Sequence, residues 1–129
     1  MALPKAIIAL DFDGTVVTHE YPHIGSDAGA VPVLKELVAN DYKLILYTMR
    51  HGELLKKAVA RFHERGIPLY AVNENPEQKS WTTSSKVYAD LYIDDAALGV
   101  PVRYLDHCSR PTVDWEAVRE ELVKMGYLD

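Results

Sequence analysis

Short apolar, β-prone segments alternate with segments of helical periodicity along the whole 129-residue chain. This alternation is typical of βαβ units, in which helices connect the parallel strands of one sheet. Right-handed connections place those helices on both faces of the sheet. The length is that of one compact domain with its own core. We therefore predict a single α/β domain over residues 1–129, with three layers in the order α/β/α and a central parallel sheet.

The same pattern assigns each element to a segment. Strands are predicted at residues 7–10, 42–48, 68–72 and 89–93, with a last, short edge strand at 100–105. Helices are predicted from Pro32 to about Asn40, over residues 53–65, and from a cap at Asp114 to a stop at Gly126. Residues 16–30 are predicted as a loop or short hairpin, and residues 73–85 as a loop with at most a short helix.

The last predicted helix carries one apolar stripe, formed by Trp115, Val118, Leu122 and Met125. Side chains on such a stripe pack against the rest of the domain. We therefore expect Trp115 to belong to the core and not to a ligand site.

Composition narrows the classes of partner and compartment. The net charge of -5 argues against broad electrostatic binding to nucleic acid or to an anionic membrane, although a local basic patch or a nucleic-acid substrate stays open. No apolar run approaches the roughly 20 residues of a membrane span, and residues 1–5 lack the features of a secretory signal. We expect a cytoplasmic protein. Cys108 is the single cysteine, which excludes an intrachain disulfide and disfavours a cysteine-based zinc site.

Two carboxylates, Asp11 and Asp13, follow the first predicted strand in the sequence D-F-D-G-T of residues 11–15. Ligands of parallel α/β sheets bind beyond the carboxyl ends of the strands, so these carboxylates are candidates for a reaction site. Gly14 allows a sharp turn after them. An ordinary strand followed by an Asp-rich turn is the alternative at this point. Further polar side chains stand at or near other strand ends, namely Thr48, Lys86, Asp94 and Asp95.

These residues, in this order, resemble the four motifs of the haloacid dehalogenase (HAD) superfamily of aspartyl-nucleophile phosphohydrolases. The resemblance implies a Rossmann-like, HAD-like fold and a phosphomonoester hydrolase. It implies that Asp11 attacks phosphorus to form an acyl phosphate, and that Asp13 protonates the leaving alkoxide and then activates water. Thr48 and Lys86 complete the implied catalytic set. Each of them, taken alone, also fits a strand end or a surface residue.

The resemblance also implies a cofactor, Mg²⁺, which prefers oxygen ligands and relieves the repulsion among clustered carboxylates. The implied ligands are Asp11, Asp94 and the carbonyl oxygen of Phe12, while Asp95 is either a ligand or an outer-shell partner. Lys86 and one Mg²⁺ still leave the four carboxylates short of one positive charge, so the site requires further donors.

Those further donors form the implied substrate site. The Thr48 hydroxyl and the backbone N–H groups of Gly14 and Met49 make up the implied phosphate cradle. Arg50 adds a charged donor if it contacts substrate, and the alternative is that it lies on the surface.

Little of the chain is left for a cap domain over the site. Residues 16–30 permit only a small flap and residues 73–85 only a loop, so the chain resembles the capless (C0-like) subgroup of the superfamily. An open site suits a macromolecular phosphoester, or a small molecule covered by another subunit of a homo-oligomer. The candidate specificity residues, each of which also fits a structural role, are His19, Tyr21, His23, Asn73, Asn75 and Trp81.

Other functions stay open beside the phosphatase. A phosphotransferase or phosphomutase would pass the phosphoryl group from Asp11 to an acceptor other than water. A non-hydrolytic phospho-aspartate regulatory module uses similar residues, but in a different order along the chain. A noncatalytic binding domain is a further class. The phosphorylated substrate itself is not indicated by the sequence.

Overall fold

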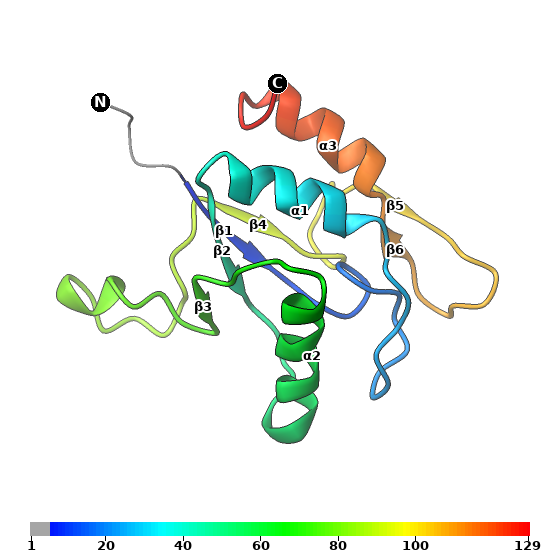
Figure 1. The fold of residues 1–129 in the computed structure, drawn as a ribbon, viewed down its shortest axis with the longest axis horizontal. Helices are drawn as coiled ribbons and strands as arrows, with labels where there is room; N and C mark the ends of the chain where they lie inside the picture. The colour runs from blue at the N-terminus through cyan, green and yellow to red at the C-terminus, as the bar shows by residue number, and fades with distance from the viewer. Residues whose placement is uncertain (1–5) are drawn as a thin grey trace.

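The computed structural model describes residues 6–129, and the expectation about residues 1–5 lies outside the described residues. The elements are β1 (Ile7–Leu10), α1 (Ala30–Ala39), β2 (Lys43–Leu46), α2 (Gly52–Glu64), β3 (Ala71–Val72), the short 3₁₀ helix η1 (Gln78–Ser80), β4 (Leu91–Ile93), β5 (Val102–Arg103), β6 (Thr112–Val113) and α3 (Trp115–Lys124). Figure 1 shows them in space. The predicted alternation of strands and helices is confirmed.

Four strands form a parallel sheet in the order β3-β2-β1-β4. β1 lies inside this sheet, and its residues Ile8 and Leu10 are fully buried, as a continuous apolar run predicts. Leu10 pairs with Leu46 on one side and with Ile93 on the other. The three strands therefore end at one level, and the residues that follow them meet at one edge of the sheet.

The strand predicted at 100–105 is present, but it is shorter than predicted and does not form an edge of the parallel sheet. Only Val102 and Arg103 are extended there, and they pair antiparallel with Thr112 and Val113 in a separate two-stranded sheet. Figure 1 shows β5 and β6 apart from the four-stranded sheet. Short strands at the two ends of a hairpin carry too little periodicity to reveal their partner.

The helices begin and end close to their predicted positions. The side chain of Asp114 caps α3 by accepting the backbone N–H of Ala117 at 3.2 Å. Trp115 is 2% exposed, and its Nε1–H donates to the carbonyl of Thr15 at 2.6 Å, which confirms its place in the core. Met125 lies beyond α3 and is 53% exposed, so its predicted place in the apolar stripe is wrong.

Helices α1 and α3 lie side by side (Figure 1). Arg119 of α3 joins them through two hydrogen bonds to the Glu36 carboxylate of α1, at 2.9 and 2.6 Å. This pairing lowers the pKa of Glu36. Helix α2 buries Phe62, whose ring lies 6.0 Å from the ring of Phe12. The two rings connect α2 to the turn that follows β1.

Residues 16–30, which we call the flap, form the predicted short hairpin. The Thr18 N–H donates to Ser26 at 2.9 Å, and the Ala28 N–H donates to Val16 at 3.1 Å. Residues 73–85 form the predicted loop, in which η1 is the one short helical turn. Within residues 6–129, no helix combines the length and the apolar character needed to cross a bilayer.

Candidate active site

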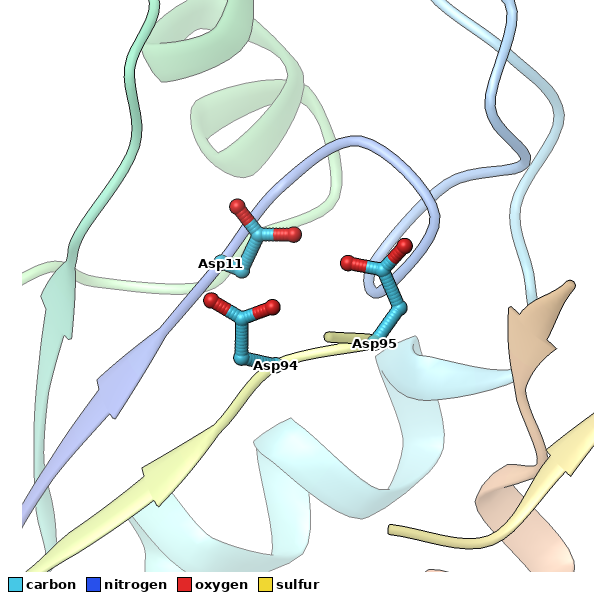
Figure 2. A group of neighbouring side chains, drawn as sticks. All are labelled: Asp11, Asp94 and Asp95. Carbon is cyan, nitrogen blue, oxygen red and sulfur yellow. The ribbon is translucent and has the colours of Figure 1, made fainter. Parts of the chain in front are cut away.

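Three carboxylates meet at the carboxyl edge of the parallel sheet. Asp11 follows β1, while Asp94 and Asp95 follow the neighbouring strand β4. The Asp11 N–H donates to the Ile93 carbonyl at 3.0 Å, which continues the pairing of the two strands. One oxygen from each carboxylate lies within 4.8 Å of the others, and Figure 2 shows the three side chains pointing toward one another. We call this group the acidic cluster.

The turn after β1 brings Asp95 against the backbone. Gly14 has a φ of 81°, and a Cβ atom there would lie 2.5 Å from Oδ2 of Asp95. The position therefore requires glycine both for its conformation and for this close approach. The buried Thr15 hydroxyl donates to Oδ2 of Asp11 at 3.0 Å and accepts the Asp95 N–H at 3.0 Å. Thr15 thus links the two halves of the cluster, a role that its place in the motif did not reveal.

Crowding of these carboxylates favours their protonated forms. Burial, a hydrogen bond with the Asp95 carboxyl and the charge of Asp94 raise the pKa of Asp11 to about 8. Burial is also the largest cause that raises the pKa of Asp94, ahead of its interactions with Asp95. A hard divalent cation would neutralise the same charges without protons. The donor set therefore fits Mg²⁺ through Asp11 and Asp94, with Asp95 beside them.

Two backbone groups implied for the site are engaged in the turn itself. The carbonyl of Phe12 accepts the N–H groups of Thr15, Val16 and Val17 at 3.1, 2.9 and 3.3 Å. The Gly14 N–H donates to the Val17 carbonyl at 2.8 Å. Hydrogen bonds within the turn therefore engage both groups. The Phe12 oxygen is not presented to a metal, and the Gly14 amide is not presented to a phosphate.

Asp13 and Arg50 form a buried bidentate ion pair. Nε of Arg50 donates to Oδ2 of Asp13 at 2.8 Å, and its Nη2 donates to Oδ1 at 2.7 Å. The side chain of Arg50 is 1% exposed and that of Asp13 is 13% exposed. The interpretation of Arg50 as a surface residue is therefore wrong.

The remaining donors of Arg50 bind backbone. Nη1 donates to the carbonyls of Pro22 and Leu54 at 3.4 Å each, and Nη2 donates to the carbonyl of His23 at 2.9 Å. Since a guanidinium carries five N–H donors, these contacts engage all of them. Arg50 thus connects the flap, α2 and Asp13, and leaves no donor free for substrate.

Thr48 and Met49 lie between β2 and α2. The Thr48 N–H donates to Oδ1 of Asn73 at 2.8 Å, and the Thr48 hydroxyl accepts the Arg50 N–H at 3.1 Å. Met49 is 98% exposed. Both residues line the same cavity as the acidic cluster. This arrangement keeps the Thr48 hydroxyl beside the site, as the motif predicts.

The cavity has a volume of about 720 Å³, within the usual range for small-molecule sites. Its lining consists of Asp11, Asp13, His19, Tyr21, Tyr47, Thr48, Met49, Arg50, His51, Asp94, Asp95, Ala96 and Arg110. The structure therefore brings together most of the predicted site residues. It also adds Tyr47, His51, Ala96 and Arg110, which the sequence did not single out.

Lys86 and part of the predicted specificity set lie outside this lining. Nζ of Lys86 is 5.7 Å from the centre of the Tyr92 ring, on an exposed side chain. Asn75 is buried, and its side chain donates to the carbonyl of Tyr88 at 3.1 Å, a structural contact. Trp81 packs edge-on against the Tyr88 ring at 5.8 Å. Among the flap residues, His19 and Tyr21 line the cavity and His23 does not.

Arg110 enters the cavity from residues 104–111, the hairpin loop between β5 and β6. Its Nη1 lies 3.3 Å from Nε2 of His19 on the flap, and its Nη2 lies 4.0 Å from Oδ2 of Asp95. No periodicity or motif marks this arginine in the sequence. Only the contact between two segments that are 91 residues apart brings it to the site.

The fold and the site define an α/β protein with an acidic cluster at the carboxyl ends of parallel strands. No protein-family model matches the chain, and no curated protein matches it either. A solved structure of a conserved protein from Bacteroides thetaiotaomicron is similar, with 37% sequence identity and a TM-score of 0.74, over 95% of this chain and 92% of that chain. The chain belongs to the same family as that conserved protein.

Proposed function

We propose that the protein is a Mg²⁺-dependent phosphomonoester hydrolase of the HAD type, which acts through a phospho-aspartate on Asp11. The observation that carries this proposal is the acidic cluster, whose three carboxylates converge within 4.8 Å at the ends of β1 and β4. Asp13 and Thr48 line the same cavity, as the order of the motifs predicts. The chemistry needs a nucleophile, a proton carrier and a cation, and these residues supply the first two and can hold the third.

The reaction has two steps. In the first, an oxygen of Asp11 bonds to phosphorus and the ester P–O bond breaks, while Asp13, protonated on an oxygen that it has released from Arg50, gives that proton to the leaving alkoxide. In the second, Asp13 takes a proton from water as that water attacks phosphorus. The acyl P–O bond then breaks, which releases phosphate and restores the Asp11 carboxylate. When bound at Asp11 and Asp94, Mg²⁺ supplies positive charge that stabilises the transferring group.

The finer features of the fold form part of the same proposal. A Rossmann-like, three-layer α/β/α domain without a large cap fits a chain whose insertions are limited to the flap and the loop at 73–85. The cavity is accessible enough for a phosphorylated small molecule or for the end of a larger phosphoester. A cytoplasmic location fits a hydrolase that depends on Mg²⁺ and carries a single cysteine.

A panel of phosphomonoesters, assayed for phosphate release with Mg²⁺, tests the proposal. We expect turnover that chelation abolishes, and a loss of at least about 10³-fold in Asp11→Asn because the nucleophile is removed. Asp41→Asn is the matched control: Asp41 is exposed and has a φ of 68°, which asparagine tolerates. Absence of turnover across the panel, or full turnover in Asp11→Asn, would contradict the proposal.

Asp13→Asn separates hydrolysis from the alternatives. With an aryl phosphate, whose leaving group needs no proton, Asp13→Asn removes only the base of the second step, so this variant should accumulate a covalent phosphoryl adduct that intact-protein mass spectrometry detects. Product analysis with added sugar and nucleoside acceptors then distinguishes release to water from transfer. A wild-type adduct that persists for hours would favour a regulatory module over a hydrolase.

A further inference from the structure

The cavity is lined by more carboxylates than permanently charged cations. Four carboxylates line it, whereas the arginines among its lining residues are Arg50 and Arg110. Lys86, to which the resemblance assigns a positive charge at the site, is not among the lining residues. A phosphoryl group adds further negative charge on its non-bridging oxygens, and its transfer requires donors placed against them. The two arginines are therefore the permanently charged side chains of the lining that can add donors to the phosphoryl group.

Arg50 cannot supply those donors without losing its own contacts. Its five N–H groups already bind Asp13 and three backbone carbonyls. Its guanidinium also lies 5.1 Å from the Phe12 ring and 5.2 Å from the Tyr21 ring, which encloses it further. Arg50 is a buried structural cation.

Arg110 has the opposite environment. Its side chain is 55% exposed, and its described hydrogen bond is the one to Nε2 of His19, which engages only Nη1. The 4.0 Å separation between Nη2 and Asp95 is longer than a hydrogen bond, so this side of the guanidinium keeps its donors beside the acidic cluster. A planar guanidinium also matches two phosphate oxygens at once, which an ammonium group cannot do.

We infer that Arg110 binds the phosphoryl group of the substrate, and that it carries the positive charge which the resemblance assigns to Lys86. The inference rests on the proposed function and adds a substrate-binding residue from outside the four motifs. It also assigns a function to the hairpin loop: residues 104–111 place a cation at the cavity, where Arg110 donates one of its N–H groups to His19 of the flap.

The test compares Arg110→Ala and Arg110→Lys with Lys86→Ala. Arg103→Ala is the matched control, because Arg103 lies in β5 of the same hairpin, is exposed, and does not line the cavity. Two quantities are measured with Mg²⁺ present: the affinity for inorganic phosphate by calorimetry, and kcat/KM on the best monoester of the panel. Thermal melting confirms that each variant is folded.

We expect Arg110→Ala to weaken phosphate binding and kcat/KM by roughly 10-fold to 100-fold, the usual loss for a charged hydrogen bond. Arg110→Lys should fall between this variant and wild type, Lys86→Ala should lose less than Arg110→Ala, and Arg103→Ala should match wild type. If Arg110→Ala melts early, the comparison moves to Arg110→Lys.

Wild-type values in both Arg110 variants, or a larger loss in Lys86→Ala, would overturn the inference and leave the proposed function standing. A wild-type protein that neither binds phosphate nor releases it from any monoester would overturn both. The two failures are therefore distinguishable.

Discussion

The floor of the cavity and its walls are positioned by different means. The floor is the acidic cluster, and its residues follow directly from the register of two paired strands. The walls are the flap, the hairpin loop and the Asp13–Arg50 ion pair, and their charged residues are placed at the cavity by tertiary contacts. Asp13 and Arg50 are 37 residues apart, and His19 and Arg110 are 91 apart. Strand order thus determines where the carboxylates of the acidic cluster lie, whereas contacts between distant segments determine which charged side chains surround them.

The largest expected effect on stability lies in the wall. Arg50→Ala leaves Asp13 as a partly buried, uncompensated carboxylate and frees three backbone carbonyls. We expect a loss of about 3–5 kcal/mol in the free energy of unfolding. Chemical denaturation followed by circular dichroism measures this loss. Arg110→Ala is the control, since its exposed side chain predicts a change within about 0.5 kcal/mol. Equal losses in the two variants would mean that the two arginines are not distinguished by burial.

The difference between floor and walls also explains which parts of the fold and of the site could be predicted from the sequence. The apolar runs before Asp11 and before Asp94 predicted both the parallel sheet and the convergence of these carboxylates, because register follows from strand pairing. Thr48 follows from the end of β2 in the same way. Each of these predictions depends on local periodicity and on the rule that parallel strands end at one edge.

Residues whose positions depend on contacts between segments were missed or misjudged. Nothing local distinguishes a buried Arg50 from a surface arginine, and nothing marks Arg110 at all. The Phe12 carbonyl was assigned to a metal because the resemblance implied it, whereas the turn geometry gives that oxygen three N–H partners. Hydrogen bonds within a turn, and pairs between distant loops, become visible only once the chain is folded.

The next largest effect on stability is expected for Gly14→Ala, next to the floor. Gly14→Ala forces a non-glycine residue to a φ of 81° and places a Cβ atom 2.5 Å from Oδ2 of Asp95. The strain should cost about 1–3 kcal/mol in the free energy of unfolding. It should also weaken Mg²⁺ binding, because Asp95 must move away from the cluster. Calorimetric titration with Mg²⁺ measures the second effect. Gly99→Ala is the control: its φ of 87° imposes the same strain, and a Cβ atom there meets nothing within 4 Å.

Gly99→Ala should therefore lose stability without losing Mg²⁺ affinity. Unchanged Mg²⁺ affinity in Gly14→Ala would show that the close approach of Asp95 to the turn does not matter for the cation.

A smaller effect is the pH dependence of stability that arises from Asp11 in the floor. The pKa of Asp11 rises from 3.8 to about 8 on folding without a metal, so its protonated form stabilises the fold below pH 3.8. This contribution is lost as the pH rises through about 8. In the presence of a chelator, the melting temperature should fall across that window. Mg²⁺ at ten times its Kd should restore about 1.4 kcal/mol, and more effectively at high pH because the ligands must be ionised.

Thermal melting at pH 6 and pH 8.5, with chelator and with Mg²⁺, measures this linkage. In Asp11→Asn, both the slope in chelator and the response to Mg²⁺ should shrink. A wild-type melting temperature that rises between pH 6 and pH 8.5 in chelator would contradict the electrostatic account of the floor.

The smallest expected effect on stability is that of Asp27→Ala, which tests the ion pairs between the flap and α2. Asp27 of the flap accepts from Arg61 at 3.1 Å and from Arg65 at 2.8 Å, both in or next to α2. These pairs are partly exposed, so Asp27→Ala should cost only about 0.2–1 kcal/mol for each pair. Hydrogen exchange is the sharper measurement, because local opening of the flap does not require global unfolding. We expect faster exchange at the Thr18 and Ala28 amides, which close the flap hairpin. Unchanged exchange at both amides would mean that the Asp27 pairs do not secure the flap, and that bonds which survive the substitution, such as those of Arg50 to Pro22 and His23, are sufficient.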